Sequence, residues 1–239
     1  MLNREVLALI LALALIISGI QSPRDSVKRD FPVALITPVV MSVFCFDGLL
    51  SRIDGLVLLS IFFVWMIAVM IEVRKQQSAA DEVLGERRCW LAIILCVVGL
   101  GFLIFAGHLI VVGAKSIAVS FGVDEFVIGA TIVAIGTSMP ELATTVVSKI
   151  RGHEEVGLGT ILGSNIFNSL WVVGVAATIS PISVSWHEVS VALVFGFLTV
   201  ALTFPTNRGF IERRRGVILL VLYVVYVVTI LQQSALPAA

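Results

Sequence analysis

Charged side chains are scarce in this sequence. Asp, Glu, Lys and Arg make up 13% of its 239 residues, where roughly a quarter is usual for a soluble domain. The 16 basic and 16 acidic residues cancel, so the composition indicates no nucleic-acid partner. The only cysteines, Cys45, Cys89 and Cys96, have neither CxxC nor metal-ligand spacing, and we interpret them as small apolar packing residues. These shortages argue against a soluble domain, a nucleic-acid-binding protein and a cysteine-ligated metal site.

Apolar residues are abundant instead, at 59% of the chain. A membrane-spanning helix needs about 20 mostly apolar residues, and several apolar runs approach or exceed that length. Residues 5–20 also fit a secretory signal, but the internal repeat described below favours a shortened span. The sequence therefore predicts an all-α membrane protein in the lipid bilayer with about eight transmembrane helices, near residues 5–20, 31–46, 55–72, 90–120, 126–148, 156–179, 188–204 and 216–232.

Basic residues set the expected topology. Eight spans place both termini on one side of the membrane, and 13 of the 16 Lys and Arg residues then fall on the other side. Only Arg4, Arg52 and Lys115 stay with the termini. By the positive-inside rule, the termini lie outside and the polar 73–89 loop lies in the cytoplasm. We expect a multi-pass protein of the bacterial inner (plasma) membrane.

The chain also repeats part of itself. FDGLLSRIDGLVLLSIFFVWMIAV (46–69) resembles NRGFIERRRGVILLVLYVVYVVTI (207–230), and ISGI (17–20) resembles ISPI (179–182). An odd number of spans separates the copies, so they have opposite orientations, as in the inverted repeats of secondary transporters. Two glycine pairs share an offset of 161 residues: Gly48 with Gly209, and Gly55 with Gly216.

This repeat predicts how the chain is divided. Residues 1–72 are the last three spans of a truncated first repeat, residues 73–89 a cytoplasmic loop, residues 90–232 a complete second repeat, and residues 233–239 a tail. The first two spans of the second repeat have no counterpart in the sequence. We therefore expect an incomplete inverted-repeat transporter that lacks its first two spans and the start of the third.

Polar residues interrupt the apolar stretch GATIVAIGTSMPELATT. Pro140 cannot donate a hydrogen bond to the carbonyl four residues back, so the helix should kink or break near 134–138 and leave carbonyls free. Thr137 and Ser138 add hydroxyls, and Glu141 lies one turn beyond Thr137 on the same face. A carboxylate at this depth is costly and indicates a functional site.

A second stretch, GLGTILGSNIFNSLWVVG, carries Thr160, Ser164 and Asn168 four residues apart as one polar stripe. Free carbonyls, hydroxyls and a carboxylate are the ligands that Na⁺ and Ca²⁺ prefer. We place the Ser164–Asn168 face against the Thr137–Glu141 face and predict an oxygen cage with Glu141 as its charged ligand. A structural proline kink and ordinary interhelical hydrogen bonds are the alternative interpretation.

These residues carry a family resemblance. GATIVAIGTSMPELATTVVSKIRG and VGLGTILGSNIFNSLWVVG, within 126–179, resemble the second α-repeat of the sodium/calcium exchanger superfamily, with its GTSxPE and GSNxxN signatures. The resemblance extends over most of 91–232, and 17–72 resembles the closing spans of the family's first half. It implies a ten-span antiporter fold that exchanges Ca²⁺ for Na⁺, or for H⁺ or K⁺ in some branches.

The resemblance also implies roles for individual residues. Some members have Asp at the position of Asn168, which leaves the ion preference open. Ca²⁺ and Na⁺ are transported substrates, and no cofactor is expected. The implied ligands are Glu141 as the essential acidic residue, Thr137 and Ser138 beside it, Ser164 and Asn168 from the second signature, and Ala134 through a backbone carbonyl to Na⁺.

The predicted function is a cation antiporter that works by alternating access. The family has two α-repeats that each give an acidic residue to one site, and this sequence has no second GTSxPE. A separate chain that supplies the first half is therefore an expected partner, and a truncated or non-transporting remnant is the alternative. An enzyme is not predicted, because Glu141 among hydroxyls offers no catalytic pair. A channel stays open, and we interpret His108 as a packing residue.

Overall fold

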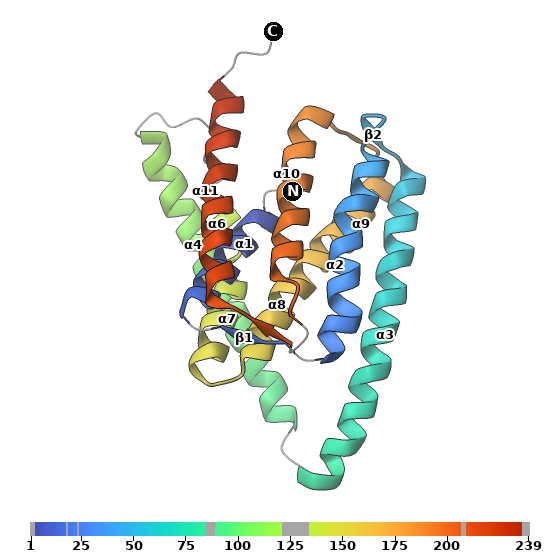
Figure 1. Cartoon of the computed structure of the whole chain (residues 1–239), viewed down its shortest axis with the longest axis vertical. Coiled ribbons are helices and arrows are strands. Elements are labelled where there is room, and N and C mark those ends of the chain that lie inside the picture. The colour runs from blue at the N-terminus through green and yellow to red at the C-terminus, as the bar shows by residue number, and fades with distance from the viewer. Residues whose placement is uncertain are drawn as a thin grey trace.

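The computed structural model describes residues 3–17, 19–22, 24–84, 89–120, 134–206 and 209–235, and most of them are helical (Figure 1). The all-α class is therefore confirmed for this part of the chain. The helices are α1 (Asn3–Ile17), α2 (Arg24–Phe44), α3 (Arg52–Leu84), α4 (Cys89–Ser120), α6 (Ala134–Thr137), α7 (Met139–Ile150), α8 (Glu154–Ile166), the π-helix η2 (Phe167–Val172), α9 (Val173–Ile179), α10 (Trp186–Thr203) and α11 (Arg213–Ala235). The strands are β1 (Ile20–Gln21), β2 (Leu49–Leu50), β3 (Ile182–Ser183) and β4 (Phe210–Ile211).

Three described helical stretches are long and apolar enough to cross a membrane. They are Arg52–Arg74, Ile93–Ile117 and Glu154–Ile179, and the last one joins α8, η2 and α9. Two shorter apolar helices cover Ala8–Ile17 and Val189–Thr203. The count of eight spans stays a prediction, because only these three stretches of the described residues are long and apolar enough to count as spans.

Helix α3 extends beyond the apolar part of its sequence. It continues to Leu84, so most of the stretch 73–89 that was predicted to be a loop is helical. The reason is local: residues 75–84 (KQQSAADEVL) are rich in Lys, Gln, Ala, Glu and Leu, which have high helix propensity. The prediction of a loop over all of 73–89 is wrong, and hydropathy alone had suggested the end of the helix too early.

Two short antiparallel ladders join elements that are far apart in the sequence. β1 pairs with β4, with Ile20 opposite Ile211, and β2 pairs with β3, with Leu50 opposite Ile182. The repeated glycines, Gly48 (φ 81°) and Gly209 (φ 72°), lie just before β2 and β4 in the left-handed region, which Gly adopts without steric cost. The repeat therefore relates the two ladders to each other, because β3 follows β1 by 162 residues and β4 follows β2 by 161.

Helix packing follows the same relation (Figure 1). α3 packs along α9, and α11 packs along α1. A Cβ atom at Gly55 of α3 would lie 2.8 Å from the carbonyl oxygen of Gly174, and a Cβ atom at Gly216 of α11 would lie 2.9 Å from that of Ala12. Gly55 and Gly216 are 161 residues apart, and their contact residues Ala12 and Gly174 are 162 apart. Each glycine lets two helix backbones come close together.

Replacing Gly216 with Ala should lower the free energy of unfolding by about 2 kcal/mol, because the added methyl group must push α11 away from α1. The Cβ atom would also lie 2.8 Å from Leu15 Cβ. Gly99→Ala on α4 is the matched control, because no atom beyond the neighbouring backbone of its own helix lies within 4 Å of its Cβ position, and it should be neutral or stabilising. Unfolding of the purified chain in mixed micelles measures both changes; equal stability of the two variants would contradict the close contact.

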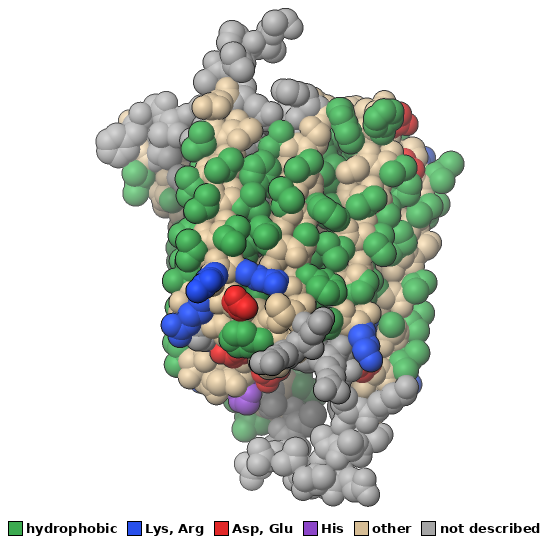
Figure 2. Space-filling view, in the orientation of Figure 1, with side chains coloured by type: hydrophobic (Ala, Val, Ile, Leu, Met, Phe, Trp, Pro, Cys, Tyr) green, Lys and Arg blue, Asp and Glu red, His purple; other side chains and the backbone are tan. Residues whose placement is uncertain are grey.

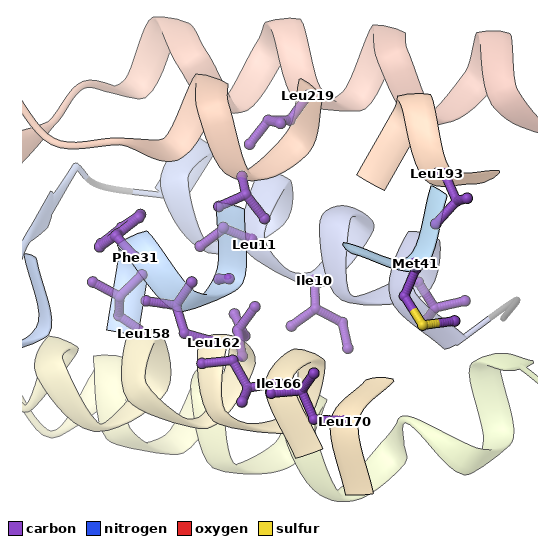
Figure 3. Packing of buried hydrophobic residues seen from close by; sticks show 14 of the residues in the cluster. Ile10, Leu11, Phe31, Met41, Leu158, Leu162, Ile166, Leu170, Leu193 and Leu219 are labelled. Carbon is purple, nitrogen blue, oxygen red and sulfur yellow. The ribbon is translucent and has the colours of Figure 1, made fainter. Parts of the chain in front are cut away.

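A large part of the hydrophobic core is formed by α1, α2 and α8, and the core extends to residues of α3, α10 and α11 (Figure 3). Leu158, Leu162 and Ile166 are spaced four residues apart on α8 and are fully buried, together with Leu11 of α1 and Phe31 of α2. This spacing puts the three α8 residues on one helix face. α7 packs along α8 as well. The core therefore holds α8 in place, and α8 in turn positions α7.

The visible outer surface is largely apolar (Figure 2). Hydrophobic side chains cover most of the face shown, and Lys and Arg side chains gather mainly toward the end where β1 and β4 lie. On α4, exposed side chains include Trp90, Phe102 and Phe105. An apolar belt of this kind is suited to lipid contact or to a further helical partner.

Candidate functional site

A helix interruption lies at the GTSMPE stretch. α6 ends at Thr137 and α7 begins at Met139, with Ser138 between them at φ −96° and ψ 8°. Pro140 lies in the first turn of α7, where its missing N–H has no helical partner to lose. The N–H of Leu142 donates to the Ser138 carbonyl oxygen at 3.0 Å. Whether α6 and α7 are two parts of one broken membrane helix stays a prediction, because residues 121–133 lie outside the described ranges.

Glu141 lies in the first turn of α7, where the positive end of the helix dipole favours a carboxylate. Ser164 of α8 donates its hydroxyl hydrogen to Glu141 Oε1 at 2.9 Å. The two polar faces that were predicted to lie together meet at this hydrogen bond. Glu141 Oε2 is buried and has no hydrogen-bond partner among the described residues. One carboxylate oxygen is therefore held by α8, and the other is not held by any described residue.

The other candidate residues differ in how deeply they are buried and in which helix they lie. Ser138 is 1% exposed, whereas Thr137 is exposed at the end of α6. Ala134 is the first residue of α6. Asn168 is half-buried and is the second residue of η2, one turn beyond Ser164. The structure thus brings Ser164 to Glu141 directly, and the roles of all six residues as ion ligands stay predictions.

Thr160, the first residue of the predicted polar stripe, makes its side-chain hydrogen bond within its own helix. Its hydroxyl donates to the Val156 carbonyl oxygen at 2.8 Å, as the Thr144 hydroxyl does to Pro140 on α7. Such bonds to the preceding turn satisfy a hydroxyl without a second helix. The Thr160 hydroxyl therefore bonds within α8, whereas the Ser164 hydroxyl bonds across to α7.

A groove of about 310 Å³ lies beside the helix interruption. α4 approaches it closely, since a Cβ atom at Gly107 would lie 2.7 Å from the Gly136 carbonyl oxygen. His108 is exposed and lines this groove together with Thr137, so its interpretation as a packing residue is wrong. The groove is lined by Ile104, Gly107, His108, Val111, Gly136, Thr137 and Pro140.

The donor set around Glu141 is made of oxygen atoms. Within the described ranges, no group of three or more His, Cys, Asp or Glu side chains is placed to hold a metal ion. One carboxylate with neighbouring hydroxyls suits a hard cation such as Na⁺ or Ca²⁺ better than a transition metal.

This fold and site define a class: a helical membrane protein with a carboxylate and hydroxyls where two helices meet, as ion transporters have. The chain belongs to the sodium/calcium exchanger family, because the model of that family, described as sodium/calcium exchanger protein, matches residues 3–71 and 91–232. It is an integral membrane protein of a transporter family, and that family is not one of enzymes.

Relatives support this assignment. Inner membrane protein YrbG of Escherichia coli (strain K12) is 34% identical over 182 residues, which are 72% of this chain and 56% of that protein. Sodium/calcium exchanger MaX1 of Methanosarcina acetivorans is 46% identical over 88 residues, which are 37% of this chain and 25% of that protein. The chain spans about half the length of the first curated relatives that it matches.

The chain is also similar in structure to a solved protein. A structure of the sodium-calcium exchanger NCX_Mj soaked with zero Na⁺ and Ca²⁺ superimposes with a TM-score of 0.73 and 27% sequence identity. The match covers 96% of this chain and 74% of that chain. The helical arrangement described above is thus the one found in a sodium/calcium exchanger.

Proposed function

We propose that this chain forms the Glu141-centred part of a Ca²⁺ site in an antiporter that exchanges Ca²⁺ for Na⁺. One observation carries this proposal: Ser164 holds Glu141 Oε1, while Oε2 is buried with no hydrogen-bond partner among the described residues. A buried carboxylate oxygen without a partner is costly, and a bound cation removes that cost. Family membership supplies the class of transported ion.

The remaining ligands follow from their place around Glu141. Thr137 and Ser138 lie at the helix interruption on one side, and Ser164 and Asn168 on α8 and η2 lie on the other. Ca²⁺ takes six to eight oxygen ligands, so these side chains supply part of a shell. Ala134 would contribute its carbonyl oxygen to Na⁺, with H⁺ or K⁺ as alternative counter-ions.

Alternating access in this proposal uses α4 as a moving element. α4 contacts α6 and α7, and its close contact with α6 runs through Gly107 and Gly136, which have no side chains to interlock. A smooth contact of this kind permits sliding, and transporters of the inverted-repeat type expose one site to the two sides in turn. The groove beside Thr137 is the opening that such a movement would widen or close.

A second candidate follows from the length of the chain relative to its relatives. The chain spans about half of the first curated proteins that it matches, and Glu141 supplies one negative charge where Ca²⁺ sites usually have more. A separate chain that brings a second carboxylate would complete the site, and a chain without such a partner would be a non-transporting remnant.

Ion flux separates these possibilities. Vesicles that contain the full chain are loaded with Na⁺ and diluted into Na⁺-free buffer with radioactive Ca²⁺, with and without a co-expressed first half from a relative. We expect Ca²⁺ uptake that requires the Na⁺ gradient and increases when the first half is present. Vesicles with equal Na⁺ on both sides are the control. Uptake that ignores Na⁺, K⁺ and H⁺ gradients alike would indicate a channel, and no uptake in either preparation would indicate a remnant.

A further inference from the structure

The segment after the GSN signature is not an ordinary α-helix. Phe167–Val172 form the π-helix η2, in which the N–H of Val173 donates to the carbonyl oxygen of Asn168, five residues earlier. π-Helical turns are rare and occur often at functional sites. This turn contains Asn168, which follows Ser164 by four residues. The backbone conformation of η2 therefore sets the position and direction of the Cα–Cβ bond of Asn168.

An aromatic cluster holds η2 against α3. We call Phe62 and Phe63 of α3, with Phe167 and Trp171 of η2, the aromatic clamp. The ring of Phe62 lies 5.8 Å from that of Phe167 and 5.2 Å from that of Trp171. Phe63 meets Trp171 edge-on at 5.7 Å, and Phe167 stacks on Trp171 at 6.3 Å. Rings on both sides of Asn168 in the sequence are thus fixed to one neighbouring helix.

The other copy of the repeat offers an internal comparison. With the offset of 162, η2 corresponds to residues 5–10, and these lie within the continuous α-helix α1. Phe167 corresponds to Glu5 and Trp171 to Leu9, so the rings of η2 have no aromatic counterpart there. The π-helical turn and its aromatic contacts occur together, in the copy that carries the GSNxxN residues.

We propose that the aromatic clamp keeps η2 in its π-helical form and thereby positions Asn168 for the Glu141–Ser164 pair. Phe62 and Trp171 are positioning residues in this mechanism, because they act on the site through Asn168. The inference rests on the proposed function for its effect on Ca²⁺ binding, whereas its effect on η2 is independent of any ion.

Amide hydrogen exchange tests the clamp without an ion. In the full chain in lipid nanodiscs, Trp171→Ala should speed exchange over residues 166–173, and Trp171→Phe, which keeps a ring, should restore protection. Trp186→Ala is the matched control, because it removes a Trp whose ring meets Phe46 at 5.5 Å away from η2. Unchanged exchange over 166–173 in Trp171→Ala would overturn the clamp.

Equilibrium binding of radioactive Ca²⁺ tests the link to Asn168. We expect Trp171→Ala to weaken binding about tenfold, as loss of a supporting residue does at metal sites, and Trp171→Phe to bind almost normally. In an Asn168→Ala background, Trp171→Ala should cost nothing more, because the two residues act as one unit. An equal further loss in that background would overturn the positioning role. If Glu141→Gln leaves Ca²⁺ binding unchanged, the proposed function fails, and the exchange experiment still decides whether the clamp holds η2.

Discussion

Replacing Glu141 with Gln is expected to weaken Ca²⁺ binding about 1,000-fold and to abolish gradient-driven uptake. The amide keeps the size of the side chain and an oxygen that accepts from Ser164, so the packing of α7 on α8 should persist. What is lost is the negative charge, and one charge pair at about 4 Å contributes about 4 kcal/mol at an effective dielectric constant near 20. That free energy corresponds to about three powers of ten in affinity. Equilibrium binding of radioactive Ca²⁺ to the full chain in nanodiscs measures the change.

The matched control is Glu155→Gln, which removes the same charge at a different place. The Glu155 side chain is 49% exposed and lies 3.4 Å from His153 in the turn between α7 and α8. Exposed ion pairs contribute little, so this variant should bind Ca²⁺ as the unmodified chain does. If the two variants lost affinity equally, general charge and not a site at Glu141 would explain binding. Unaltered affinity in Glu141→Gln would remove this residue from the ligand set.

The contact between Glu141 and Ser164 could be expected from the sequence, because the spacing of residues along a helix determines which side chains share a face. Thr137 and Glu141 share one face of their helix, as Ser164 and Asn168 do of theirs, and both faces are too polar for lipid. The repeated Gly48 and Gly209 could likewise be found from the sequence, because their shared offset marks two turns that need the same left-handed backbone. Both features depend only on residues that are close together in the sequence, so they can be predicted without knowing how distant helices pack.

Other features depend on how distant helices meet and could not be read from the sequence. The π-helix η2 has an ordinary apolar sequence, FNSLWV, and its aromatic contacts with Phe62 appear only when α3 lies beside it. His108 looked like a filler residue because nothing in its own helix indicates that α4 presents it to a groove. The extent of α3 to Leu84 was missed for a different reason, since helix propensity and membrane hydropathy are separate signals.

A partly buried ion network joins α2 to α3 just before the predicted span at 31–46. Asp30 accepts hydrogen bonds from Arg29 Nε at 2.7 Å, from Arg29 Nη2 at 3.0 Å and from Trp65 Nε1 at 3.1 Å. Arg29 Nη1 also donates to Glu72 of α3. The hydrogen bond with Asp30 raises the pKa of Arg29 above its ordinary value, against the opposing effect of burial. The guanidinium therefore keeps its charge at neutral pH, and it needs the Asp30 carboxylate beside it.

Asp30→Asn should consequently lower the free energy of unfolding by about 2 kcal/mol, which is less than the roughly 3–5 kcal/mol for a fully buried ion pair because Arg29 keeps some exposure. The side chain of Asp30 is 7% exposed, whereas that of Glu72 is 27% exposed. Glu72→Gln removes the same charge from the same network and should cost about 1 kcal/mol or less. Unfolding of the purified chain in mixed micelles measures both variants. Equal losses would contradict the larger role of the more deeply buried Asp30 in joining α2 to α3.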